Sequence, residues 1–372
     1  MISDRARFLI WATAGVVCLL VGGAAAPAPA TESSIVLARL VSPGFGIVAT
    51  SSASGTRLLA RLDGRLWRDV TPRRALFQPE DIVFVDRRYG WFVANDCAEA
   101  RANVYRTSDG GRTWHSVPVD ATNCAAGSAL ALSFIDHDHG WLVRTFENAP
   151  AADLQRTDDG GATWTRVSEL PLLGRVAFRT AREGWLARSD FVGGDVGGPT
   201  LLATRDGGRT WARKTLVLPP AWRRARSFPD LPTFFGARGV LPVTLFTPRR
   251  SAIAFYATRD GGRSWTLRAV QPVGYRTLLH ATPFPRYVPS AIASPEVWWA
   301  VAGIARTRVL VTTDAGRHWS ASRPATPARA TLAAITSAGR ASAWLAIGSV
   351  RERRLLASSN AGRTWRPLVP PR

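Results

Sequence analysis

The sequence predicts an all-β fold, a seven-bladed β-propeller of four-stranded blades, from three observations. A motif ending in tryptophan recurs along the chain, its copies lie about 50 residues apart, and short apolar runs bounded by turn residues lie between them. Repeats of this period are typical of solenoids and propellers. A propeller closes its repeats into a ring, which avoids the open sheet edges of a linear array.

The first observation is the motif Thr-x-Asp-Gly-Gly-x-Ser/Thr-Trp. Full copies span residues 107–114, 157–164, 204–211 and 258–265, weaker copies span 312–319 and 358–365, and 62–67 is degenerate. The spacing divides residues 31–372 into seven units and predicts a single domain. We expect structural roles in the turns for Asp109, Trp114, Asp159, Trp164, Asp206, Trp211, Asp260, Trp265, Asp314, Trp319, Asn360 and Trp365.

A second motif, Phe-x-Asp followed by Gly-Trp, keeps phase with the first. Phe84 precedes Gly90-Trp91, Phe134 precedes Gly140-Trp141, and we expect Trp298 and Trp344 to hold the same place later. The apolar runs predict strand A ending near Phe84, strand B from Trp91, strand C over 103–107 and strand D over 113–119.

The turn between strands C and D has a clear chemistry. Its aspartate can accept backbone N–H groups of its own tight turn, and its glycines adopt backbone angles that other residues resist. The tryptophan then buries its ring between strands. The motif thus predicts turns that stabilise the fold, and it gives no reason to assign the aspartates to catalysis.

The two motifs together resemble known families. The turn motif resembles the Asp-box, or bacterial neuraminidase repeat, of sialidases and sortilin-type domains. With the Phe-x-Asp and Gly-Trp motif, the chain is most similar to the photosystem II stability/assembly factor family. The resemblance implies an exported, non-enzymatic, seven-bladed propeller, and it transfers no functional residue. Fold does not decide activity, because this repeat occurs in proteins of unrelated function.

The N-terminus has the layout of a secretory signal peptide. Arg5 and Arg7 precede an uncharged run from Phe8 to Ala26, and a small-residue cleavage pattern follows at 28–30. We therefore expect residues 1–30 to be a signal peptide and 31–372 to lie outside the cytoplasm. An uncleaved membrane anchor is the alternative, since the run is nearly long enough to span a bilayer.

Export would place Cys97 and Cys124 in an oxidising compartment. Both fall in connections of the second blade that share one face, Cys97 between strands B and C and Cys124 after strand D. We therefore predict a disulfide between them, with two free thiols as the alternative.

The strand order also sorts the arginines by face. The A–B and C–D turns lie on one face, and the B–C and D–A loops lie on the other. We predict a basic region on the second face, across blades five, six, seven and one, as a candidate partner-binding surface. It comprises Arg73, Arg74, Arg223, Arg224, Arg226, Arg249, Arg250, Arg276, Arg306, Arg351, Arg353 and Arg354.

Blades two to four carry acidic residues in the same loops, which predicts a polarised face. These are Glu99, Asp120, Glu147, Asp153, Asp190 and Asp195. The alternative is a generally basic protein with solvated arginines. The arginines inside the repeats, such as Arg112, Arg209 and Arg263, are expected to be exposed on the opposite face and inert.

The formal charge of +21 favours acidic partners. Export argues against nucleic acid, so we expect a monomer that binds an acidic protein segment or another envelope component, with membrane-surface association as an alternative. We expect no cofactor and no metal, because no cluster has metal-ligand spacing. His137 and His139 are expected to be solvated in a turn, and Gly193–Gly198 to be a flexible loop.

The leading hypothesis is a non-catalytic binding or assembly scaffold that engages a protein through its basic loop face. The alternative is an exported glycoside hydrolase, sialidase-like, or a carbohydrate-binding propeller. No Arg-Ile-Pro motif and no pair of carboxylates can be nominated for the hydrolase. A sensor for a small ligand is a third possibility. Two carboxylates facing each other across an axial pocket would favour the enzyme.

Overall fold

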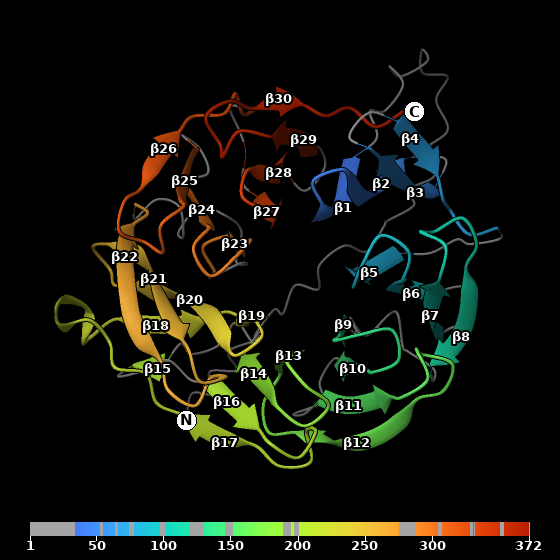
Figure 1. Ribbon diagram of the computed structural model, residues 1–372, viewed down its shortest axis with the longest axis horizontal. Coiled ribbons are helices and arrows are strands. Elements are labelled where there is room, and N and C mark those ends of the chain that lie inside the picture. The colour runs from blue at the N-terminus through green and yellow to red at the C-terminus, as the bar shows by residue number, and fades with distance from the viewer. Residues whose placement is uncertain are drawn as a thin grey trace, which may run out of the picture.

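The computed structural model is a ring of seven β-sheets around a central axis (Figure 1). It describes residues 34–52, 55–63, 66–73, 78–96, 101–119, 129–145, 152–188, 195–196, 201–274, 287–303, 307–327, 330, 332–349 and 353–371. Six of the sheets have four antiparallel strands each. The sheet of the fifth blade has six strands, two of them short additions. The predicted seven-bladed propeller is confirmed. The predicted signal segment, residues 1–30, lies outside the described residues.

The first four blades follow the chain from its described start. Their strands are β1 (Ser34–Ser42), β2 (Phe45–Ser52), β3 (Gly55–Leu62) and β4 (Leu66–Asp69), then β5 (Gln78–Phe84), β6 (Gly90–Asp96), β7 (Arg101–Thr107) and β8 (His115–Val119), then β9 (Ala129–Phe134), β10 (Gly140–Thr145), β11 (Ala152–Thr157) and β12 (Thr165–Leu170), and finally β13 (Gly174–Phe178), β14 (Gly184–Arg188), β16 (Leu201–Thr204) and β17 (Ala212–Lys214).

The last three blades complete the ring. Their strands are β18 (Arg226–Pro229), β19 (Thr233–Phe235), β20 (Arg238–Phe246), β21 (Ser251–Thr258) and β22 (Thr266–Pro272), then β23 (Ser290–Ile292), β24 (Trp298–Ala302), β25 (Arg308–Thr312) and β26 (Ser320–Ser322), and finally β27 (Leu332–Ala338), β28 (Ser342–Gly348), β29 (Arg353–Ser358) and β30 (Arg366–Pro367). A 3-10 helix, η2 (Pro220–Trp222), precedes β18.

The predicted strands of the second blade agree with β5 to β8, except at the start of β8. That strand begins at His115 rather than at residue 113. Thr113 still belongs to the turn, because its amide and hydroxyl donate hydrogen bonds of 3.0 and 2.7 Å to the Asp109 carboxylate. The tight turn therefore continues past the residue at which a strand was expected.

The fifth blade departs from the repeat. Its first strand is split into β18 and β19, which both pair with β20. The short strand β15 (Asp195–Val196), from the fourth blade's B–C connection, pairs with β18. The prediction of an unstructured flexible loop over Gly193–Gly198 is therefore wrong at these two residues, because they add a strand to the neighbouring blade.

Stacked aromatic rings join consecutive blades. Trp141 of the third blade stacks on Phe178 of the fourth, with ring centroids 3.6 Å apart, and Trp91 stacks on Phe134 at 3.7 Å. The Trp91 indole N–H also donates to the Gly160 carbonyl in the next blade's Asp-box, at 2.8 Å. Each Gly-Trp motif therefore packs its own blade against the following one.

The glycine of this motif makes room for the phenylalanine ring on strand A. A Cβ atom at Gly90 would lie 2.3 Å from the Phe84 ring.

The strand register corrects the predicted position of Trp298 in the Gly-Trp motif. Gly90 pairs with Phe84 and Trp298 pairs with Ile292, so Trp298 occupies the glycine position and Trp299 the tryptophan position. Trp344 does hold its predicted place.

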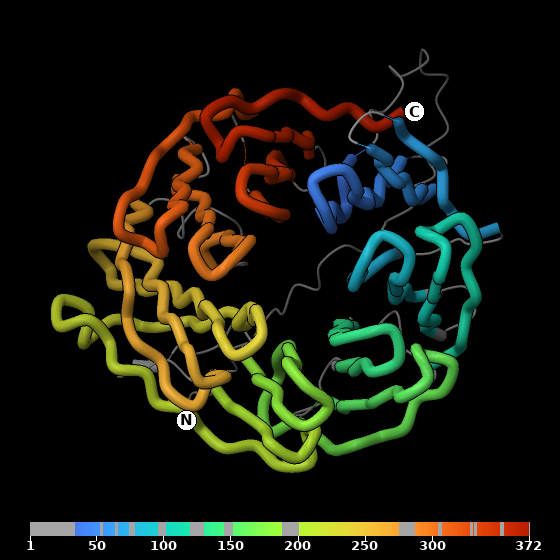
Figure 2. Tube along the Cα trace, in the orientation of Figure 1, coloured from blue at the N-terminus to red at the C-terminus, as the bar shows by residue number. Residues whose placement is uncertain are grey.

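The ring closes by side-chain packing between the seventh and first blades. Each of these blades takes all four strands from one continuous stretch of chain, and the two stretches lie side by side (Figure 2). Trp344 packs against Ile35, Leu40 and Val48 of the first blade. The Leu40 amide also donates a 3.1 Å hydrogen bond to the Thr336 hydroxyl. Hydrophobic burial, rather than a shared sheet, therefore holds this seam.

Within the part of the chain that the structure describes, no helix has the length and apolar character needed to cross a membrane.

Candidate functional site

The molecule presents two faces, which we name by their connections. The turn face carries the A–B and C–D turns, and the loop face carries the B–C and D–A loops. The antiparallel order of every blade fixes this division. The hairpin between β5 and β6 and the turn between β7 and β8, for example, lie on the turn face.

The Asp-box aspartates are engaged within their own turns. In the fifth blade, Asp260 accepts hydrogen bonds from the Ser264 amide at 2.9 Å and the Ser264 hydroxyl at 2.6 Å. It also accepts one from the Thr258 hydroxyl at 2.7 Å. The hydroxyl and amide of Ser264 hold the pKa of Asp260 well below its ordinary value. Asn360 contacts the equivalent groups without a charge: its side-chain oxygen accepts from the Thr364 amide at 3.0 Å, and its side-chain NH2 donates to the Thr364 hydroxyl at 2.9 Å.

The boxes of the third and fourth blades show the same effect. Burial alone would raise the pKa of Asp206, but hydrogen bonds from the Thr210 hydroxyl and amide outweigh it and lower the pKa to about 2. The pKa of Asp159 is likewise lowered to about 2, with burial opposed by bonds from Thr163. Carboxylates held ionised by their own turn stabilise the fold and are poor proton donors at neutral pH.

These lowered pKa values predict an acid-sensitive fold. A carboxylate whose pKa is depressed on folding contributes stability above its unfolded pKa of roughly 4, and this contribution is lost as the pH falls toward the folded pKa. We expect the thermal unfolding midpoint to fall between pH 4 and pH 2. Replacing both Asp159 and Asp206 by Asn should flatten that decline, because Asn360 shows that the turn accepts an amide.

The exposed carboxylate Asp63 offers a control for this measurement, since it lies outside these two boxes. An Asp63→Asn variant should keep a larger share of the wild-type pH dependence than the double variant. An unfolding midpoint in the double variant that declines as steeply as in the wild type would contradict the assignment.

On the loop face, the structure brings five predicted arginines together at the fifth blade. We call Arg223, Arg224, Arg226, Arg249 and Arg250 the blade-five cluster. Arg226 begins β18 and pairs with Phe246 at the end of β20, directly before the loop that holds the last two. All five side chains are exposed, and none forms an ion pair with a carboxylate among the described residues.

The backbone beneath the cluster is held firmly. The Arg250 guanidinium lies 4.4 Å from the centre of the Trp222 ring and donates to the Ala221 carbonyl. The Tyr256 hydroxyl donates a 2.8 Å hydrogen bond to the Val217 carbonyl. Trp222 is buried in the core that the fourth and fifth blades share. A cation–π contact of this kind orders the guanidinium and keeps its charge.

Other predicted arginines are placed differently. Arg353 is half-buried, and it donates a 3.2 Å hydrogen bond to the Val36 carbonyl across the ring seam. Its burial lowers its pKa. Its guanidinium is therefore engaged within the protein, and the assignment of Arg353 to a partner-binding surface stays a prediction. Arg73 and Arg354 are exposed on the loop face. The described residues do not include Arg74, Arg276, Arg306, Arg351, Cys97 and Cys124.

The predicted acidic side of the loop face is only partly described. Asp153 forms ion pairs with the buried Arg144 at 3.0 Å and with Arg166 at 2.9 Å, so its charge is neutralised within the third blade. Asp195 begins the short strand β15. Glu99, Asp120, Glu147 and Asp190 lie outside the described residues. The loop face thus shows a basic cluster, and its polarity stays a prediction.

The turn-face histidines are more engaged than expected. His137 lies 2.8 Å from Asp86 of the preceding blade and stacks on Tyr89 at 3.8 Å between ring centroids. His139 contacts the Asp136 carboxylate at 2.9 Å. Both rings are partly exposed to solvent, as expected; His137 in addition joins two neighbouring A–B turns, whereas His139 bonds within its own turn.

Two carboxylates that the sequence did not single out lie side by side on β5. Burial raises the pKa of Asp81, although its oxygens accept hydrogen bonds from the Leu132 amide at 2.9 Å and the Ile82 amide at 2.8 Å. Burial likewise raises the pKa of Glu80. Asp81 bonds to the backbone of the next blade, so it ties two blades together. In the sequence, the only sign of this buried aspartate was the run Pro79-Glu80-Asp81 at the start of an otherwise apolar strand.

The described residues include no group of three or more His, Cys, Asp or Glu side chains that could hold a metal ion. Glu80 and Asp81 are neighbours on one strand, and they do not face each other across a pocket. An acid and a nucleophile for glycoside hydrolysis need that facing arrangement.

Comparison with known proteins agrees with this architecture. Residues 117–301 match a family described as the photosynthesis system II assembly factor YCF48. No curated protein matches the chain. A structure of YCF48 from Cyanidioschyzon merolae is similar at 14% identity and a TM-score of 0.56, over 91% of this chain and 98% of that one.

Two further structures are also similar to this chain. YCF48 bound to D1 peptide is 17% identical over 78% of this chain and 80% of that one, with a TM-score of 0.48. A polysaccharide lyase, an ulvan lyase, is 11% identical over 91% of this chain and 96% of that one, with a TM-score of 0.53. At these identities the likeness to the Cyanidioschyzon merolae protein and to the lyase shows the fold alone.

Proposed function

This chain is a seven-bladed propeller similar to the photosystem II assembly factor family, and on that premise we propose that it is an exported, non-catalytic scaffold that binds a protein partner. The matching family is one of assembly factors, which supports a protein-binding role. The blade-five cluster is the proposed docking point. It is a set of five exposed arginines on an ordered part of the loop face.

The geometry of the cluster favours an acidic segment as its partner. A guanidinium group presents several N–H donors in a fixed plane and grips carboxylates in pairs of hydrogen bonds. The net charge of +21 adds a long-range attraction for acidic chains. Val217, which is 82% exposed in the D–A connection that also holds Arg223 and Arg224, offers an apolar contact for the same segment.

The single observation that carries this proposal is that five exposed arginines share one site without a carboxylate partner among the described residues. Arginines scattered over a generally basic protein would not gather on two adjoining connections of one blade. The docking surface therefore belongs to the fifth blade and its neighbours on the loop face.

A charge-matched pair of variants tests the proposal. The first changes Arg223, Arg224 and Arg249 to Ser and leaves Arg250, which packs on Trp222. The control changes Arg209, Arg263 and Arg317, exposed arginines of the turn face, to Ser. Binding of a fluorescent decaglutamate peptide, followed by anisotropy, should weaken roughly tenfold or more in the first variant and much less in the control.

Equal losses in the two variants would show that net charge alone attracts the peptide, and would contradict a defined docking site. Thermal unfolding of both variants should match the wild type, because none of the six side chains is buried.

A further inference from the structure

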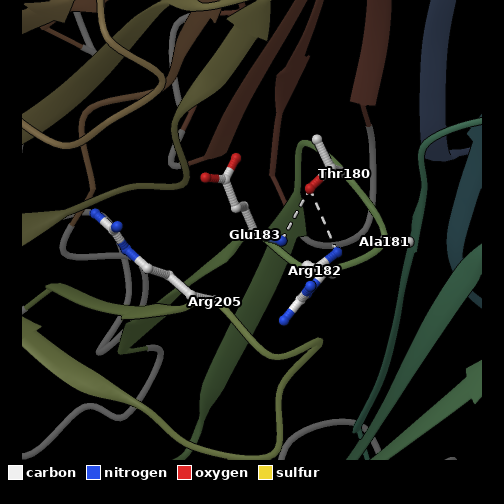
Figure 3. Close-up of a pocket in the computed structure, with 5 residues that line it drawn as sticks. All are labelled: Thr180, Ala181, Arg182, Glu183 and Arg205. Atoms are coloured by element: carbon white, nitrogen blue, oxygen red, sulfur yellow. Dashed lines mark hydrogen bonds between the residues drawn. The ribbon is translucent and has the colours of Figure 1, made fainter.

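A hollow of about 500 Å³ opens on the turn face of the fourth blade. Its lining comes from the A–B turn between β13 and β14, residues 180–183, and from Arg205, which directly precedes the Asp-box aspartate (Figure 3). The Thr180 hydroxyl accepts hydrogen bonds from the amides of Arg182 and Glu183, at 3.3 and 3.0 Å. The floor of the hollow is therefore an ordered turn.

Two of the lining side chains are unpaired cations. Arg182 and Arg205 are exposed, and within the described part of the chain no carboxylate forms an ion pair with either. The one acidic group of the lining, Glu183, is bound by Arg179. Figure 3 shows Arg182 and Arg205 on opposite sides, with the Glu183 side chain between them. The hollow thus offers two separated sites for negative charge.

The equivalent place in the third blade shows that this arrangement is not a property of the repeat. The Gly160 amide donates to Asp138 and the Gly207 amide donates to Arg182, so these two turn residues correspond. Asp138 and Asp158 thus take the places of Arg182 and Arg205, and Asp158 is paired with Arg156. The fourth blade therefore reverses the local charge and leaves it uncompensated.

We propose that this hollow is a second binding site, distinct from the loop face, for an acidic oligosaccharide. Guanidinium groups bind carboxylates and sulfates, and two of them set apart match acidic groups on different parts of one ligand. The Glu183 carboxylate can accept a hydrogen bond from a sugar hydroxyl, and the Thr180 hydroxyl, whose oxygen already accepts two amide hydrogen bonds, can donate one. The volume suits a ligand of a few rings, and the Glu183 carboxylate and the Thr180 hydroxyl suit one that carries hydroxyl groups.

Trigalacturonate is a suitable probe, with maltotriose as its neutral counterpart and triglutamate as an acidic peptide. Titration calorimetry of the protein should show binding of trigalacturonate, and Arg182→Ser and Arg205→Ser should each weaken it roughly fivefold or more. Arg259→Ser is the matched control, because Arg259 is the exposed residue at the same box position of the fifth blade. It should change the affinity less than twofold.

Three results would overturn the proposal. They are trigalacturonate binding no better than maltotriose, triglutamate binding as tightly as trigalacturonate, and Arg259→Ser losing as much affinity as Arg205→Ser. The loop-face variant at Arg223, Arg224 and Arg249 should bind trigalacturonate like the wild type. Failure of this site and failure of the protein-docking surface are therefore distinguishable.

Discussion

Replacing Trp141 by alanine should lower the free energy of unfolding by about 3–5 kcal/mol, the usual cost of deleting a buried aromatic side chain. The ring is fully buried, stacks on Phe178 at 3.6 Å, and donates a 3.3 Å hydrogen bond to the Gly207 carbonyl. These contacts join the third and fourth blades, so the variant loses packing on both sides of one blade interface. Urea unfolding followed by tryptophan fluorescence and circular dichroism measures the loss.

Two companion variants sharpen this experiment. Trp141→Phe retains an aromatic ring beside Phe178 and loses the indole N–H, so its cost should lie well below that of the alanine variant. Leu66→Ala removes a side chain that is 70% exposed and should change stability by less than about 0.5 kcal/mol. An alanine variant at Trp141 as stable as the Leu66 variant would contradict the role given to the Gly-Trp motif.

Gly46→Ala should destabilise the ring seam by about 1–3 kcal/mol through overpacking. A Cβ atom at Gly46 would lie 2.3 Å from the Trp344 ring and 2.8 Å from the Arg39 carbonyl. Blades one and seven meet through packed side chains and share no sheet, so the overlap of the added Cβ with Trp344 has to be relieved by moving these side chains. Differential scanning calorimetry of the variant should show a lower unfolding midpoint.

The smaller side chain in Trp344→Leu should relieve part of this strain. In a double-mutant cycle, the two changes together should therefore cost less than the sum of their separate effects. Gly44→Ala is the control, because its nearest neighbour, in the same first blade, is 3.5 Å away. If Gly46→Ala is no less stable than Gly44→Ala, the tight packing of Trp344 against Gly46 at the seam is contradicted.

Much of the architecture could be predicted from local chemistry. An aspartate in this tight turn, followed by a tryptophan directly before strand D, makes the same hydrogen bonds in each box, so each box identifies a C–D turn independently of its surroundings. Copies at a constant period then imply equal blades, and antiparallel order assigns each loop to a face. The blade-five cluster follows from that order, because Arg226 and Arg250 close the same end of one sheet.

Other features depended on contacts between residues far apart in the chain. Arg353 is half-buried, because the closing of the ring brings its guanidinium against the Val36 carbonyl, more than 300 residues away in the chain. Asp81 is bound by an amide of the next blade, and the pairing of β14 with β16 places Arg182 and Arg205 on opposite sides of one hollow. Sequence periodicity determines the ring and its two faces, because those follow from local turns. Burial and charge pairing at individual residues were decided only by the tertiary structure, because each blade's environment is completed by its neighbours.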